Sequence, residues 1–258
     1  MRTGAVNALY ATGTFVVVLL AWQVIVSALH LAAYFIPTPL EILAALVSER
    51  VVYAANLLIT LWSTLLAFVI ATAIAVILGA LVSEVLFLRR TVYPLLIALQ
   101  SMPRIALAPV IIVWFGFGIS SKVVLGAFTA FFPIFLNTVH GIATTDRDHL
   151  ALMRTLRANR WQVFCKVKLP GALPFLLAGA NIAIIFAILA VIVGEFLGAN
   201  RGMGYLIVNE SNQMDMAGVF ASIFLLSAAG LCFHYGLGFL RRWLLFWAAS
   251  SEPDADGS

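Results

Sequence analysis

The stretch DRDHLALMRTLRANRWQVFCKVKLPGALP, residues 146–174, is a basic island between long uncharged runs, and it separates the chain into membrane-sized apolar pieces. The stretch contains only two acidic residues but six basic ones, which are Arg147, Arg154, Arg157, Arg160, Lys166 and Lys168. A compact basic loop of this size in an apolar chain indicates a segment that a cytoplasmic partner binds.

The composition around the island predicts a membrane protein. Hydrophobic residues make up 63% of the chain and charged residues 10%, against about 45–50% and about 25% in soluble domains. The net charge of +4 does not indicate a nucleic-acid partner, because the cations lie between apolar runs, where the positive-inside rule explains them. Cys165 and Cys232 suggest neither a disulfide framework nor a metal site.

The apolar runs predict six membrane-spanning helices, since a bilayer core needs about 20 apolar residues for each helix. They lie near residues 14–36, 57–82, 91–115, 122–145, 172–198 and 215–241. The first run is too long, and its basic start too weak, for a cleaved signal peptide.

Charge asymmetry predicts how the spans are oriented. With the island in the cytoplasm, eleven of the fifteen lysines and arginines lie on the cytoplasmic side, which also places both termini there. We therefore expect a cytoplasmic N-terminus over residues 1–12, a six-span membrane domain over 13–249 with its cytoplasmic loop at 146–170, and a disordered acidic tail over 250–258.

The island itself predicts two short amphipathic helices. Residues 149–156 place Met153 and Leu156 at helical spacing, and residues 160–169 do the same for Trp161 and Phe164. Asn159 can cap the second helix, and Pro170 and Pro174 should end one helix and start the next. Such helices suit docking of a partner protein; the alternative is a loop whose cations only contact lipid headgroups.

Arg104 is one of two charges at membrane depth, where an ionisable residue is costly and usually functional. Pro103 and Pro109 should break its helix, and broken backbone at this depth requires protein or a water-filled cavity. Gln100, Ser101 and Arg104 are therefore candidates for lining a passage. The alternative is an Arg104 side chain that extends to the membrane surface.

Glu195 is the second charge, and it lies between Gly194 and Gly198, which permit close helix packing. It could line the outer mouth of the passage, pair with Arg104 or Arg201, or cap backbone groups. We favour a structural role.

Motifs for chemistry are missing from the sequence. The four histidines are scattered without metal-ligand spacing. No phosphate-binding Gly-x-x-x-x-Gly-Lys-Ser/Thr loop and no Gly-x-Ser-x-Gly nucleophile elbow occurs. We therefore expect no metal, no cofactor, no catalytic residue and no ATP hydrolysis by this chain.

The chain resembles the nitrate/sulfonate/taurine family of bacterial ABC importer permeases, from about residue 37 to about residue 243. The resemblance rests on SMPRIALAP at 101–109 with WFG at 114–116, FPI at 132–134 with Asn137, Thr138 and Gly141, GEFLGA at 194–199 with RGMGYL at 201–206, and VKLP at 167–170. The last of these takes the Ile-x-Leu-Pro place of the cytoplasmic loop signature of ABC permeases.

The resemblance implies the six-helix, all-α fold of type I importers in the bacterial inner membrane. It also implies a second permease subunit, a homodimer being the simplest case, a cytoplasmic ATPase dimer, an extracytoplasmic binding protein, and contact with membrane lipid but not nucleic acid. Carried onto this chain, the ATPase-coupling residues would be Met153, Leu156, Arg157, Ala158, Trp161, Phe164, Leu169 and Pro170.

Two residues of the loop signature are absent here, its glutamate and its glycine. Arg157 takes the place of the glycine, where the family's turn needs a positive φ that costs arginine about 1 kcal/mol. Either the turn has another geometry in this chain, or the ATPase surface has adapted.

Substrate and mechanism have several candidates. The family resemblance favours a small anion such as nitrate, a sulfonate or taurine, and neutral heterocycles such as a thiamine-pyrimidine precursor or riboflavin are the alternative. A stand-alone secondary transporter would couple through intramembrane acids, of which Glu195 is the only candidate. A membrane-embedded enzyme would need a cluster of reactive side chains, which the sequence lacks.

Overall fold

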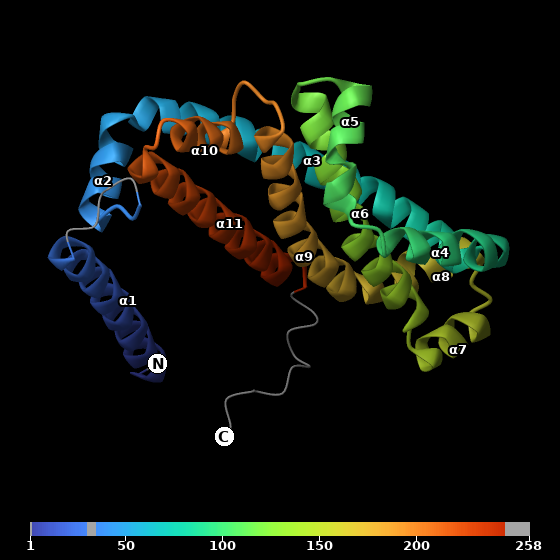
Figure 1. Ribbon diagram of the computed structural model, residues 1–258. Helices are drawn as coiled ribbons and strands as arrows, with labels where there is room; N and C mark the ends of the chain where they lie inside the picture. Colours follow the sequence, from blue (N-terminus) through green and yellow to red (C-terminus); the bar gives the residue numbers. More distant parts are fainter. Residues whose placement is uncertain (1, 30–34, 246–258) are drawn as a thin grey trace. The chain divides into compact units, whose positions relative to one another are not determined.

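The computed structural model describes residues 2–29 and 35–245, and within them the protein is helical, without a β-strand (Figure 1). The elements are α1 (Arg2–Ala28), α2 (Pro39–Ser48), α3 (Arg50–Glu84), α4 (Leu86–Gln100), η1 (Arg104–Leu107), α5 (Ala108–Phe115), α6 (Ile119–Ala143), α7 (Arg147–Thr155), α8 (Arg160–Val163), η2 (Phe164–Lys168), α9 (Leu169–Phe196), α10 (Met203–Asn212) and α11 (Met216–Leu244). The predicted tail at 250–258 lies outside the described residues.

The helices fall into two compact units. One comprises Met1–Ile59 and Asn200–Ala228, and the other comprises Thr60–Ala199 and Ala229–Ser258. The second unit contains the island and both membrane charges singled out above.

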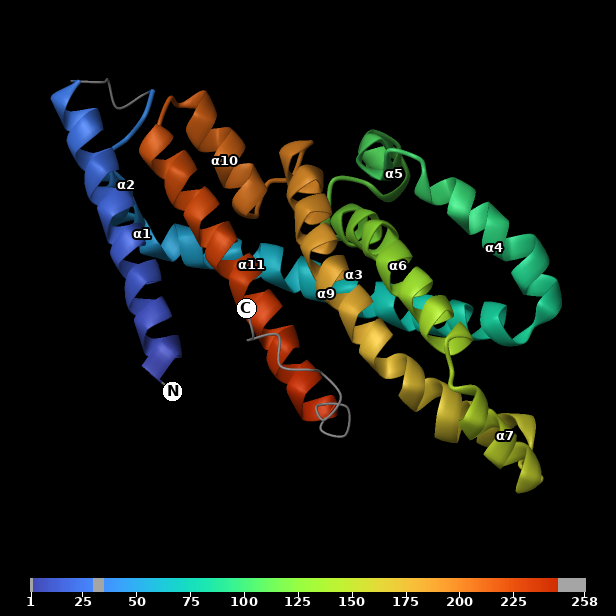
Figure 2. The ribbon, with the colours of Figure 1, turned by 90° about the horizontal axis from the view of Figure 1, so that it is seen from below.

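The second unit is built around α6 and α9, which run side by side in both views (Figures 1 and 2). Glycines permit this close approach. A Cβ atom on Gly179 would lie 2.7 Å from the Pro133 carbonyl oxygen, and one on Gly141 would lie 3.0 Å from the Ala172 Cα. In a membrane, where lipid tails are as apolar as side chains, packing of this kind replaces the hydrophobic effect as the force between helices.

In the first unit, α2 begins with a capping box. The Thr38 hydroxyl accepts a hydrogen bond from the Glu41 backbone N–H, and the Glu41 carboxylate accepts one from the Thr38 backbone N–H. Pro39 stands in the first turn, where its missing N–H costs nothing. Ile42 on this helix is buried in one cluster with Tyr53, Met203 and Leu206.

Four helices are long and apolar enough to cross a membrane, namely α3, α6, the continuous segment Arg160–Phe196, and α11. A fifth candidate is the pair of segments Leu86–Gln100 and Arg104–Phe115, which is bent by 89°. The apolar helix Thr12–Ala28 occupies the place of the predicted first span. The all-α membrane fold predicted from the sequence is confirmed, whereas the count of spans is four or five by this measure.

The bend in the third predicted span lies at Pro103, between Gln100 and Arg104. Helix α4 ends at Gln100, and α5 starts with Pro109 in its first turn. Pro103 precedes a short 3₁₀ turn between them. The predicted break of this helix is therefore confirmed.

The predicted break at Pro170 is wrong, because the helix continues from Arg160 to Phe196. The segment Phe164–Lys168 widens into a π-helix, and the Leu169 N–H bonds to the Phe164 carbonyl five residues back. Pro170 lacks an N–H and its ring would clash with a carbonyl of the preceding turn. A widened turn just before it relieves both problems without ending the helix.

Candidate transport pathway and coupling loop

Arg104 follows the bend of the third span, and its side chain is half-buried against α6 and α9. Its guanidinium carbon lies 5.2 Å from the centre of the Phe132 ring and 5.7 Å from that of Phe186, both within cation–π range. A pocket of about 240 Å³ opens beside it, lined by Met102, Pro103, Arg104, Ile105, Thr129 and Phe186. The pocket is thus apolar and aromatic, with one cation.

Pro133 explains the hydrogen bond that Arg104 makes. In a regular helix the N–H of residue 133 would bond to the carbonyl of Thr129, but proline has no N–H. The Arg104 Nη1 atom donates to the Thr129 oxygen at 3.1 Å instead. A proline on one helix therefore leaves an acceptor that an arginine from another element satisfies.

The two other pathway candidates on this segment differ in exposure. Gln100 is the last residue of α4 and is half-buried, and Ser101 follows it on the surface of the bend. The pocket beside Arg104 includes neither side chain in its lining.

Glu195 near the end of α9 is buried, with 1% of its surface exposed. The Lys122 Nζ atom lies 3.2 Å from the Glu195 Oε1 atom, and Lys122 is 4% exposed. The Thr60 hydroxyl on α3 lies 3.0 Å from both carboxylate oxygens. The acid thus joins α3, α6 and α9 at one point, and its cationic partner is Lys122 rather than Arg104.

Lys122 is a residue that the sequence reasoning missed as a site residue. The sequence shows only that Lys122 lies in the first turn of an otherwise apolar span. A lysine at the end of a span is normally taken to be exposed at the membrane surface. A second missed group is Glu210 on α10, which is 6% exposed and accepts hydrogen bonds from the Tyr53 and Ser222 hydroxyls at 2.9 and 3.0 Å.

The first helix of the island, α7, ends in a left-handed turn at Arg157, whose φ is 51°. The Ala158 N–H bonds to the Met153 carbonyl and the Arg157 N–H to the Arg154 carbonyl, both at 3.0 Å, which is the Schellman pattern. Arginine therefore adopts the conformation that glycine has in the family signature, and a changed turn geometry is excluded.

The second helix of the island begins as predicted. The Asn159 side chain accepts from the Gln162 N–H, and the Gln162 side chain accepts from the Asn159 N–H, which forms a capping box. Leu156 and Trp161 are 66% and 71% exposed. The Trp161 ring stacks on Phe164, with 5.9 Å between ring centres.

Of the remaining predicted coupling residues, Arg157 is exposed and the others are less so. Met153, Ala158, Phe164, Leu169 and Pro170 are all half-buried. Lys168 forms a salt bridge with Glu84 at the end of α3, which holds the island against α3. Leu156 and Trp161 are thus the predicted apolar coupling residues that are exposed, and Leu152 on α7, at 56% exposed, is a third exposed apolar side chain of the island.

A metal site finds no support in the part of the chain that the structure describes, because no group of three or more His, Cys, Asp or Glu side chains gathers there. The site consists instead of a bent helix, a buried ion pair and an amphipathic loop. A broken apolar helix beside a half-buried arginine, together with an exposed amphipathic loop, is typical of membrane transport proteins.

Comparison with known proteins identifies the family. Residues 71–245 match the family model of the binding-protein-dependent transport system inner membrane component, and the chain belongs to this family of ABC importer permeases. Its members are transport subunits in the inner membrane that work with an ATPase and a substrate-binding protein, and they are not enzymes.

Three relatives cover nearly all of the chain. The formylaminopyrimidine transport permease ThiX of Halalkalibacterium halodurans is 37% identical over 93% of this chain and 96% of its own. The riboflavin transport permease RibX of Chloroflexus aurantiacus is 34% identical over 92% and 89%. The putative aliphatic sulfonates transport permease SsuC of Bacillus subtilis is 32% identical over 92% and 86%.

A solved structure agrees with the fold. A chain of the inward-facing MetNI methionine ABC transporter matches with a TM-score of 0.64 and 21% identity, over 72% of this chain and 93% of that chain.

Proposed function

We propose that this permease carries a planar heterocyclic solute across the membrane and that Arg104 faces the passage. The observation that carries the proposal is the Arg104 guanidinium between two phenylalanine rings in an apolar pocket. The ring of Phe186, which lines the pocket, can stack on a flat solute, whereas the buried Phe132 ring holds the guanidinium in place. The guanidinium donors that are not bonded to the Thr129 carbonyl can bond to carbonyl or ring-nitrogen acceptors of the solute. Two of the three relatives above are named for heterocycles, a formylaminopyrimidine and riboflavin.

A small anion is the second candidate substrate. It is favoured by the positive charge of Arg104 and by the relative named for aliphatic sulfonates. An anion would use the charge of Arg104 but would gain little from the phenylalanine rings.

The proposal includes the partners and the orientation. Two copies of the chain would form the passage, and a binding protein would deliver the solute from outside. Both termini and the loop 146–170 would face the cytoplasm, with residues 13–249 as the permease domain. Gln100 and Ser101 would lie along the passage with Arg104. Glu195, also predicted as a pathway residue, is buried against Lys122 and would instead hold the helices beside the passage together.

Coupling to ATP would act through the island. An ATPase dimer would dock on the predicted coupling residues of the island, with Leu156 and Trp161 at the centre of the contact. Closure of the ATPases would then move the loop as a rigid element and reorient the spans, as in domain closure around a hinge.

Uptake by the complete transporter tests the substrate. Cells that express this chain with its ATPase and binding protein should accumulate labelled formylaminopyrimidine, and unlabelled taurine or nitrate in excess should not compete. Competition by the anions and no accumulation of the heterocycle would support the second candidate instead.

Substitution of Arg104 tests the passage. Arg104→Ala should lower uptake roughly tenfold, because a tenfold change corresponds to the free energy of about one hydrogen bond to a charged group. Arg104→Lys should recover part of the rate if the forked geometry matters and most of it if charge alone matters. Arg50→Ala, at an exposed cation of α3, is the control.

The same arginine also satisfies the Thr129 carbonyl, so a loss of structure must be separated from a loss of transport. Pro133→Ala supplies the missing helical N–H, and the double variant with Arg104→Ala should regain thermal stability but not uptake. Normal uptake by Arg104→Ala at matched membrane levels would remove Arg104 from the passage.

A further inference from the structure

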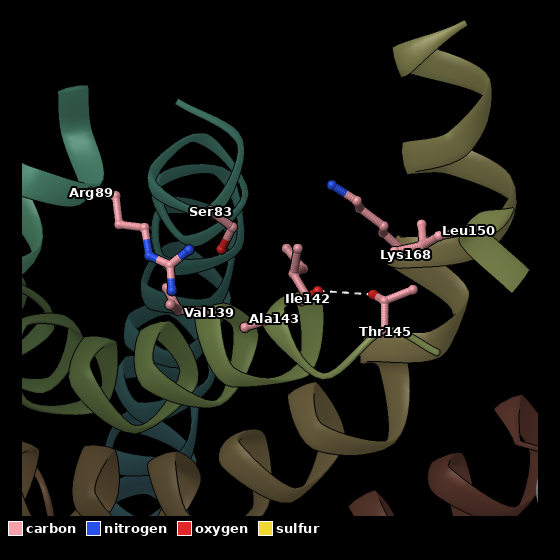
Figure 3. A pocket seen from close by; sticks show the side chains of 8 residues that line it. All are labelled: Ser83, Arg89, Val139, Ile142, Ala143, Thr145, Leu150 and Lys168. Atoms are coloured by element: carbon pink, nitrogen blue, oxygen red, sulfur yellow. Dashed lines mark hydrogen bonds between the residues drawn. The ribbon is translucent and has the colours of Figure 1, made fainter. Parts of the chain in front are cut away.

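A pocket of about 190 Å³ lies among the end of α3, the start of α4, the end of α6, α7 and η2, and two cations line it (Figure 3). Arg89 comes from α4 and Lys168 from the end of the island, and Ser83 lies between them in this view. A cavity of about 10–15 Å³ is enough for one water molecule. A pocket of about 190 Å³ is therefore large enough for a phosphate group with its ester oxygens.

Arg89 is the cation that is open to a ligand. Among the residues that the structure describes, its guanidinium donates no hydrogen bond and faces no acid, and it is exposed. Lys168 is bridged to Glu84 and supplies its remaining donors to the same space. The pair therefore provides one uncompensated positive charge and several N–H donors.

The backbone around the pocket does not oppose an anion. Helix α6 ends here, and free carbonyls at a helix C-terminus would repel a negative group. The Thr144 hydroxyl donates to the His140 and Gly141 carbonyls, and the Thr145 hydroxyl donates to the Ile142 carbonyl at 2.8 Å (Figure 3). Ser83 donates to the Gly79 carbonyl, so the two cations are the donors left for a ligand.

The surroundings favour a lipid as the source of the phosphate. Val85, Leu86 and Phe87 directly precede the cation and are 41%, 61% and 71% exposed. Exposed apolar side chains beside arginines at the end of a membrane helix are typical of headgroup depth, and basic pockets between spans bind anionic headgroups there.

We propose that this pocket binds the phosphate group of an anionic phospholipid through Arg89 and Lys168. The proposal rests on the cytoplasmic orientation of the island given under the proposed function. Because Leu150 of α7 also lines the pocket, a bound lipid would contact the island and stabilise its position against α3 and α6.

Lipid retention by the purified transporter complex tests this site. Native mass spectrometry would count phosphatidylglycerol molecules that stay bound after stepwise delipidation. Arg89→Gln should retain about fivefold less lipid than the parent, the effect of one cation near an anionic headgroup. Arg90→Gln, the adjacent exposed cation that does not line the pocket, should stay within twofold of the parent.

Two further measurements keep the outcome clear. Arg89→Lys should retain as much lipid as the parent. If Arg89→Lys and Arg89→Gln lose lipid equally, the substitution disturbs the structure of the site rather than removing its charge, which overturns the proposal.

In a second experiment, millimolar inorganic phosphate is added without lipid. A thermal shift with phosphate in the parent but not in Arg89→Gln, together with no selective lipid retention, would assign the pocket to a soluble anion and overturn the lipid.

Arg89→Gln and Arg90→Gln could retain equal amounts of lipid, with no thermal shift on addition of phosphate. That result would overturn the proposal and would mean that Arg89 only offsets the partial negative charge at the C-terminus of α6. Failure of the orientation itself is distinguished by the thiol-labelling experiment described in the Discussion, which does not involve the pocket.

Discussion

At the scale of single residues, the buried ion pair of Lys122 and Glu195 is the feature with the largest energetic consequence. Neither side chain can reach bulk water, since their side chains are 5% and 0% exposed. Removing one partner of a buried pair leaves an uncompensated charge, whereas replacing both partners by uncharged residues is often close to neutral.

Lys122→Met should therefore destabilise the permease by about 3–5 kcal/mol. The double variant Lys122→Met/Glu195→Gln should recover most of that loss. Thermal unfolding of the purified complex measures both, with Lys166→Met as a control at an exposed lysine. A double variant as unstable as the single one would show that the pair is not the source of the stability.

Glu210 is a second buried acid, and it makes the stability of the first unit depend on pH. Burial raises the pKa of Glu210, Asp215 and Glu49 raise it further, and the hydrogen bonds from Tyr53 and Ser222 lower it in part. A raised pKa means that the folded state holds the proton more tightly than the unfolded state. The stabilisation is then full below the ordinary carboxyl range and is lost as the pH rises through the raised value.

Glu210→Gln keeps the shape of the side chain but cannot titrate, so its stability should not fall over that pH range, while that of the parent does. Melting temperatures of both proteins at a series of pH values provide the measurement. Glu41→Gln, at an exposed acid of α2, should behave like the parent. Parallel curves for Glu210→Gln and the parent would contradict the assignment.

At the scale of elements, the island consists of the short helix α7 and the capped start of the long helix Arg160–Phe196, with an apolar edge. The Schellman turn at Arg157 and the capping box at Asn159 hold Leu156 and Trp161 exposed on adjoining turns. Exposed large apolar side chains in a cluster mark an interaction surface.

The double variant Leu156→Asp/Trp161→Asp should insert in the membrane normally but release the ATPase and lose uptake, because two charges would have to be buried in the contact. Co-purification of the ATPase measures docking. Val47→Asp, at an exposed residue of α2 away from the island, is the control. Retention of the ATPase by the double variant would show that another surface docks it.

At the scale of the whole molecule, orientation is the property that remains to be measured. In a background with Cys165→Ser and Cys232→Ser, a cysteine at position 159 should resist a membrane-impermeant thiol reagent added outside intact cells. A cysteine in place of Gln213, between α10 and α11, should react. The reverse pattern would invert the topology.

Much of the architecture was predictable because membrane helices follow from local sequence. Apolar runs define spans without knowledge of their neighbours, since the bilayer requires every backbone group to be bonded within the helix. Pro103 and Pro109 predicted the bend, and Asn159 predicted the cap, because these effects act within a few residues. Pro170 was misleading, since a π-turn five residues long absorbed it.

The side-chain partners were not predictable in the same way. Lys122 and Glu195 are separated by 73 residues, and Tyr53 and Glu210 by 157. Which helices lie side by side decides such pairs. The pairing of Arg104 with the Thr129 carbonyl depends on Pro133 at a distant position, and only the packing of η1 against α6 brings them together.

The sequence by itself determined the solvent, the helical class, the family and the position of the basic loop between the spans, because composition, apolar length and charge bias are local quantities. The tertiary structure alone decided which buried charges are paired, that Arg157 accepts a left-handed turn, and that Arg89 and Lys168 line one pocket. These outcomes depend on distances between residues far apart in the chain, and the free energy of a buried charge is set by those distances and by the water they exclude.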